Sequence, residues 1–127
     1  MRTFLAFLLL SLLNCENVLS QSWAMLNSQA MTYYQEGDFQ SAIKTANQAL
    51  HLAKDEFGVL SEAYLSSLSN LAYAQSGKGD YIDAVKNFSS LLTLSIERYQ
   101  LPHISQFEAL LELSKTYVSV AKYDSAE

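Results

Sequence analysis

The sequence of 127 residues is poor in the residues that end or cross-link secondary structure. It contains one proline, four glycines and one cysteine, and half of its residues are hydrophobic. Sandwiches and barrels need many turn residues, so this composition argues against a β-rich fold. Both a disulfide framework and a thiolate zinc site need several cysteines, and the single cysteine, Cys15, therefore excludes them. We expect a helical protein whose core is held by apolar packing.

Positive charge is also scarce. Lysine and arginine number 8 against 13 aspartates and glutamates, which gives a net charge of -5. A protein that binds nucleic acid needs a cationic face to neutralise the phosphates. We therefore expect no nucleic-acid partner.

Long apolar segments are absent, since the longest run extends only from Phe4 to Leu13. A helix needs about 20 apolar residues to cross a bilayer, so we expect no stable membrane span. A positive residue (Arg2), a short apolar run and then small residues are typical of a secretory signal peptide. Val18 and Ser20 suit the positions before a cleavage site. We therefore predict a signal peptide at residues 1–20 and an exported protein in the periplasm, cell envelope or medium.

Two other interpretations of this segment stay open. In the first, Leu12-Leu13-Asn14-Cys15 is a lipoprotein signal and Cys15 carries the lipid anchor, although Asn14 is a poor residue just before the cysteine. In the second, the apolar run is a buried helix of the folded protein.

The rest of the chain contains an internal repeat. The segments EGDFQSAIKTANQAL, KGDYIDAVKNFSSLL and VAKYDSAE align at one constant interval, and their shared positions are Phe39, Tyr81 and Tyr123, then Ala42, Ala84 and Ala126. In the first two units, apolar residues at helical spacing lie on both sides of a Gly-Asp pair, which predicts two helices and a turn. Gly37 and Gly79 are expected to end one helix in the left-handed conformation, and Asp38 and Asp80 to cap the next. Ala121 replaces the glycine in the third unit, so a distorted turn is expected there before a second helix.

This pattern resembles the 42-residue tetratricopeptide repeat of kinesin light chain and of many bacterial repeat proteins. The second unit carries the pattern best, at Leu68, Leu71, Ala72, Gly79, Tyr81, Ala84, Phe88 and Leu91. The resemblance implies an all-α, antiparallel helix-hairpin solenoid over residues 21–127, with repeats at about 22–59, 60–101 and an incomplete 102–127. Solenoids normally end in a polar capping helix, so we expect a fragment of a longer protein, with an uncapped apolar face that allows self-association.

The resemblance also implies a protein-binding scaffold whose first helices line a concave face for a peptide or a partner helix. Carried over by position, this face comprises Asn27, Met31, Tyr34, Ser69, Asn70, Tyr73, Glu112 and Lys115, with Ser28 as a further member. Asn70 either holds a peptide backbone or packs helices together. The two tyrosines either contact a ligand or shield a neighbouring helix. The first two units lack the lysines and arginines that clamp the acidic tails of chaperones, so such a partner is not expected.

No catalytic constellation is visible. His51 and His103 are isolated, without the HExxH spacing of a zinc site, and no glycine loop suits a phosphate, so we expect no enzyme, cofactor or metal. The acidic residues Asp55, Glu56 and Glu62 indicate a solvated helix end, with a weak divalent cation site as the alternative. The alternative function is regulatory. Ala53 to Gly58 resembles linkers in repeats that precede CHAT-type peptidase or sensor kinase domains, in which case the catalytic domain would follow Glu127.

Overall fold

The computed structural model describes residues 22–100 and 103–126. The signal peptide predicted at residues 1–20, with Cys15, lies outside them. Within the described residues the chain forms helices and no strand: a first helix at residues 22–35, then α2 (Phe39–Phe57), α3 (Glu62–Lys78), α4 (Tyr81–Tyr99) and α5 (Ile104–Ala126). The all-α prediction is confirmed.

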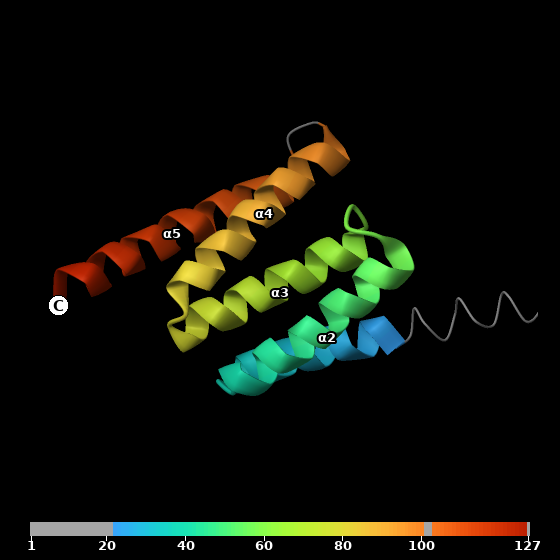
Figure 1. Ribbon diagram of the computed structural model, residues 1–127, viewed down its shortest axis with the longest axis horizontal. Coiled ribbons are helices and arrows are strands. Elements are labelled where there is room, and N and C mark those ends of the chain that lie inside the picture. The colour runs from blue at the N-terminus through green and yellow to red at the C-terminus, as the bar shows by residue number, and fades with distance from the viewer. Residues whose placement is uncertain (1–21, 101–102, 127) are drawn as a thin grey trace, which may run out of the picture.

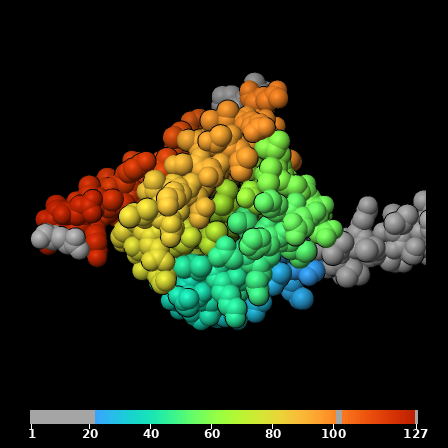
Figure 2. Space-filling view, viewed as in Figure 1, coloured from blue at the N-terminus to red at the C-terminus, as the bar shows by residue number. Residues whose placement is uncertain are grey.

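The helices are stacked in chain order as antiparallel neighbours (Figure 1). α3 packs between α2 and α4, and α4 packs against α5. In the view of Figure 2, α2 and α4 form the two nearer ridges of the surface. The first residues of α2 and α4, Phe39 and Tyr81, are equivalent positions of the repeat, and so are the first residues of α3 and α5. The repeat found in the sequence therefore coincides with the repeat of helices in the structure, as in a helix-hairpin solenoid.

Small residues allow the helices to approach closely. The alanines of α2 at Ala42, Ala46, Ala49 and Ala53 are fully buried. The centre of the core is Phe88 of α4, which is 1% exposed and belongs to a buried cluster with Leu65, Leu68 and Ala72 of α3. On its other side α3 buries Leu71 against Ala30 and Ala46. α3 is thus apolar on two faces because it has a helix on each.

The predicted turn chemistry is right at three of four positions. Gly37 and Gly79 have φ angles of 78° and 92°, the left-handed region that favours glycine. The Asp38 carboxylate accepts a hydrogen bond of 3.1 Å from the Ser41 backbone N–H and so caps α2. Asp80 makes no such bond, and its carboxylate instead lies 3.1 Å from the ammonium of Lys78. The predicted cap at Asp80 is therefore wrong.

The third unit also departs from expectation. α5 continues without a break from Ile104 to Ala126, so the turn and second helix expected around Ala121 do not form. Alanine is the best helix former and is costly in the left-handed conformation, so nothing at this position ends the helix. Tyr123 and Ala126 consequently lie on α5 itself.

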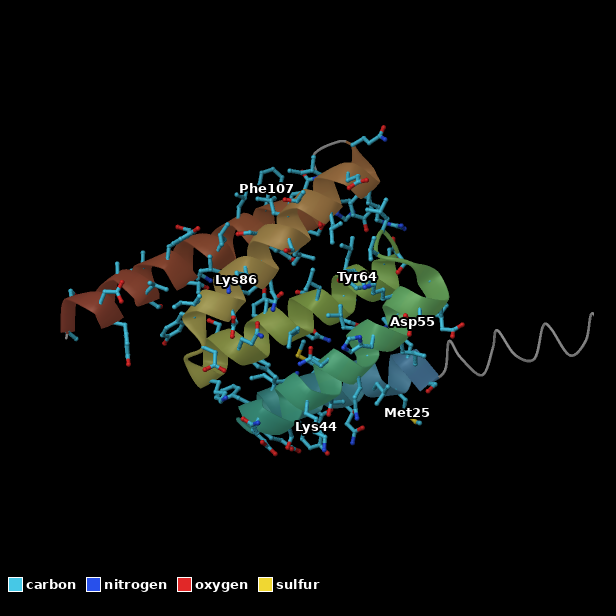
Figure 3. All side chains as sticks on the ribbon, viewed as in Figure 1. Met25, Lys44, Asp55, Tyr64, Lys86 and Phe107 are labelled. Atoms are coloured by element: carbon cyan, nitrogen blue, oxygen red, sulfur yellow. The ribbon has the colours of Figure 1, made fainter. Side chains whose placement is uncertain are left out.

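α5 exposes apolar side chains along much of its length. Only Ala109 and Thr116 of this helix are buried. Figure 3 shows Phe107 at the outer edge of α5. The large apolar residues that this helix exposes are Ile104, Phe107, Leu110, Leu111, Tyr117, Val118 and Tyr123.

Candidate functional site

A groove of about 380 Å³ lies between α3 and α5. One wall is a face of α3, and the other is the start of α5 with the turn before it. Buried side chains of Leu65, Phe88 and Leu91 form an apolar floor, and polar groups surround it. The polar lining comprises Glu62, Ser66, Ser69, Asn70, Tyr73, Tyr99, His103, Ser105 and Glu108.

Three of the eight residues expected on the concave face, Ser69, Asn70 and Tyr73, line this groove. The other five lie elsewhere. Glu112 and Lys115 form an ion pair of 2.7 Å one turn along α5. Asn27, Met31 and Tyr34 belong to the first helix, which does not line the groove.

A hydrogen-bond network joins the first helix to α3 and fixes the orientation of both asparagines. The indole N–H of Trp23 can only donate, and it donates to the Ser67 hydroxyl at 2.9 Å. The Ser67 hydroxyl in turn donates a hydrogen bond to Asn27 Oδ1 at 3.1 Å. Asn27 Oδ1 also accepts from Asn70 Nδ2 at 2.9 Å, and Asn27 Nδ2 donates to the Ser66 hydroxyl at 3.0 Å. Each amide therefore has one self-consistent orientation.

This network divides the groups of Asn70 between two tasks. Its amide nitrogen donates to the backbone oxygen of Asn27 as well as to the side chain, at 3.3 Å and 2.9 Å. Its Oδ1 accepts no hydrogen bond from the described residues, and Asn70 lines the groove. Ser66, which accepts from Asn27, keeps its own hydroxyl proton to donate. The α3 wall thus offers an acceptor and a donor one helical turn apart.

Aromatic side chains connect the first helix to the groove. The rings of Tyr34 and Tyr73 lie 6.1 Å apart, and Tyr73 meets the edge of Phe88 at 5.4 Å. Tyr34 also lies 5.8 Å from Phe39, so its ring packs between two other aromatic side chains. Burial raises the pKa of Tyr73, and the negative charges of Glu112 and Glu108 raise it further.

The rim of the groove also holds residues that were not expected on the concave face. The His103 imidazole stacks on Tyr99, with ring centroids 3.9 Å apart, and its Nδ1 lies 2.9 Å from the Ser105 hydroxyl. Glu62 contacts Arg98 at 3.5 Å and accepts from the Tyr99 hydroxyl at 3.5 Å. His103 therefore lies in the turn before α5, as a loop residue, and lines the groove.

Two of the missed residues had a signal in the sequence. Ser66 and Glu108 each lie one helical turn before an expected groove residue, Asn70 and Glu112, and so share its face. Tyr99 and His103 had none, because they flank the turn between α4 and α5, where helical spacing gives no information.

Residues 22–100 and 103–126 were compared with the requirements of a metal centre and of a membrane-spanning helix. Among them, no three His, Cys, Asp or Glu side chains gather closely enough to hold a metal ion. The weak cation site considered at Asp55, Glu56 and Glu62 is thus not formed. No helix in this part of the chain is long and apolar enough to cross a membrane.

A family profile, described as tetratricopeptide repeat, matches residues 21–97, more than half of the chain. The chain belongs to the tetratricopeptide repeat family. Repeats of this family generally mediate protein–protein interactions and are typically non-catalytic. No curated protein matches the sequence.

Proposed function

We propose that this tetratricopeptide repeat protein is an interaction scaffold that binds a peptide or partner segment in the groove between α3 and α5. The observation that carries the proposal is the α3 wall, where Ser66 retains a donor and Asn70 an acceptor beside an apolar floor. An extended peptide has free backbone N–H and C=O groups that suit such partners. In a helix these backbone groups are already hydrogen-bonded to each other, so the groove favours an extended segment.

The groove is tested by selecting a peptide from a random display library and mapping its contacts by NMR with the ¹⁵N-labelled chain. We expect amide shifts at Ser69, Asn70 and Tyr73. Ser69→Trp should abolish binding because it fills the groove, whereas Ser90→Trp, on the exposed side of α4, should not. Equal loss in both variants, or shifts confined to α2 and α4, would contradict the proposal.

We also propose export, supported by the sequence of residues 1–20. Mass spectrometry of the protein from its own cells should then find Gln21 as the first residue. A lipid on Cys15 would support the lipoprotein alternative, and an intact Met1 would refute export. The regulatory alternative, with an enzyme domain after Glu127, stays a prediction that sequencing of the downstream gene tests.

A second candidate function is self-association through α5. Phe107 and Leu110 occupy the repeat positions of Leu65 and Leu68, which α3 uses to pack against α4. They are 64% and 49% exposed on α5. If this surface joins two copies, Phe107→Glu should convert a dimer to a monomer in size-exclusion chromatography with light scattering. A wild-type chain that is monomeric at high concentration would exclude this function.

A further inference from the structure

The charge of the groove is one-sided. None of the residues that line it is a lysine or arginine, and two, Glu62 and Glu108, are carboxylates. A third carboxylate, Glu112, lies one turn beyond Glu108 on α5. The groove therefore presents negative charge and no cation of its own.

Only part of this charge is neutralised by nearby cations. Glu62 is paired with Arg98 at 3.5 Å, and Glu112 with Lys115 at 2.7 Å. Glu108 forms no ion pair with any described residue. Its charge nevertheless acts inside the groove, because Glu108 and Glu112 both contribute, after burial, to the raised pKa of Tyr73.

We propose that the groove selects an extended peptide by a lysine or arginine side chain placed against Glu108. This inference rests on the proposed function and adds the chemistry of the partner. The aliphatic stem of such a side chain can cover the apolar floor at Leu65 and Leu91 while its cationic head reaches the carboxylate. The peptide backbone meets Ser66 and Asn70 on the opposite wall.

The expected selectivity is moderate. Glu108 is exposed to solvent, so its pair with a cation is screened. Loss of one exposed ion pair typically weakens binding by about two- to fivefold. Reversing the charge adds repulsion to the lost attraction, so we expect a change of roughly tenfold from Glu108→Lys.

The test uses fluorescence anisotropy with the full chain and three labelled versions of the peptide selected above. The versions carry the original basic residue, norleucine or glutamate at one position. We expect the selected peptides to be enriched in lysine or arginine, and the basic version to bind most tightly. Glu108→Gln should weaken that version by about two- to fivefold, and Glu108→Lys should make the glutamate version the better ligand. Glu56→Gln removes the same charge from exposed α2 and should change nothing.

The outcomes separate this inference from the function on which it rests. Selected peptides that map to the groove but lack basic residues, or that bind Glu108→Gln and wild type alike, would overturn the inference and leave the scaffold function standing. A loss that is equal in Glu56→Gln would also overturn it, because the effect would then be one of net charge. Failure to select any groove-binding peptide would overturn both.

Discussion

Replacing Asn27 by alanine tests the network that holds the first helix on α3. The side chain of Asn27 makes three hydrogen bonds, with Ser66 at 3.0 Å, Ser67 at 3.1 Å and Asn70 at 2.9 Å. Each is expected to stabilise the fold by about 1 kcal/mol net. Ser67 is fully buried, so its hydroxyl loses its acceptor with no access to water. Asn70 and Ser66 are partly exposed and can bond to solvent, which lowers the total. We therefore expect a loss of about 2–3 kcal/mol in the free energy of unfolding.

Urea unfolding followed by tryptophan fluorescence measures this loss directly. Trp23 is the only tryptophan, and its indole donates to Ser67 within the same network. Circular dichroism of the helices should give the same midpoint if the chain unfolds in one step. The matched control is Gln29→Ala, which removes an amide from the same helix whose only described bond is an exposed one to Tyr33 at 3.2 Å.

We expect Gln29→Ala to change stability by less than about 0.5 kcal/mol. If Asn27→Ala costs no more than this control, the network contributes little and the orientation derived for Asn70 loses its support. If the cost reaches the expected range, Asn70 is held in place by the fold. The Asn27→Ala chain should then also bind the selected peptide more weakly.

Three further predictions concern the core and the caps. Phe88→Ala should lower the free energy of unfolding by about 3–5 kcal/mol, since Phe88 is 1% exposed; a loss below about 2 kcal/mol in urea would show that the core refills the space. Ser95→Ala should raise the free energy of unfolding by about 1 kcal/mol, because the buried Ser95 hydroxyl has no partner among the described residues; a drop in Tm would contradict this reasoning. Hydrogen bonds from the Ser41 hydroxyl and N–H lower the pKa of Asp38, so its stabilising effect is present above about pH 4 and is lost as the pH falls below that value. The Tm of Asp38→Ala should therefore fall less than that of wild type on going from neutral pH to about pH 3, and equal falls would contradict the role of this cap.

Much of the fold follows from the sequence because core contacts repeat. The apolar spacing around Leu68, Leu71 and Ala72 predicted a buried helix face, and all three are buried. The departures depend on a single residue each. At Asp80 the neighbouring Lys78 attracts the carboxylate away from the helix end. At Ala121 an alanine stands where the other units have glycine, and alanine favours continuation of the helix. A periodic pattern describes what many positions share, so it does not reveal the effect of a single residue.

Less of the site was predictable. The resemblance assigned Ser69, Asn70 and Tyr73 to one face of α3, and all three line the groove, because residues one turn apart on a helix share a face. Sequence spacing could not show that the Asn27 side chain forms its hydrogen bonds with α3, since these bonds join residues that are distant in the sequence. Nor could it place His103 on Tyr99, which depends on the path of a turn. Periodicity thus identifies a helix face, and tertiary contacts decide which members of that face are free to bind.

The register separates the positions that build this fold from those that give the groove its chemistry. Positions facing the core stay apolar or small from one unit to the next, as at Ala30 and Ala72. Positions at or beside the groove become acidic in the last unit. One register position holds Ala24, Ser66 and Glu108, and another holds Ser28, Asn70 and Glu112. A solenoid needs only the core positions to stack its units, so the others are free to vary with the ligand. Because both series become acidic only on α5, the proposed recognition of charge falls to that wall, whereas α3 supplies neutral hydrogen-bonding groups. A bound peptide should therefore lie with its basic side chain toward α5 and its backbone toward α3.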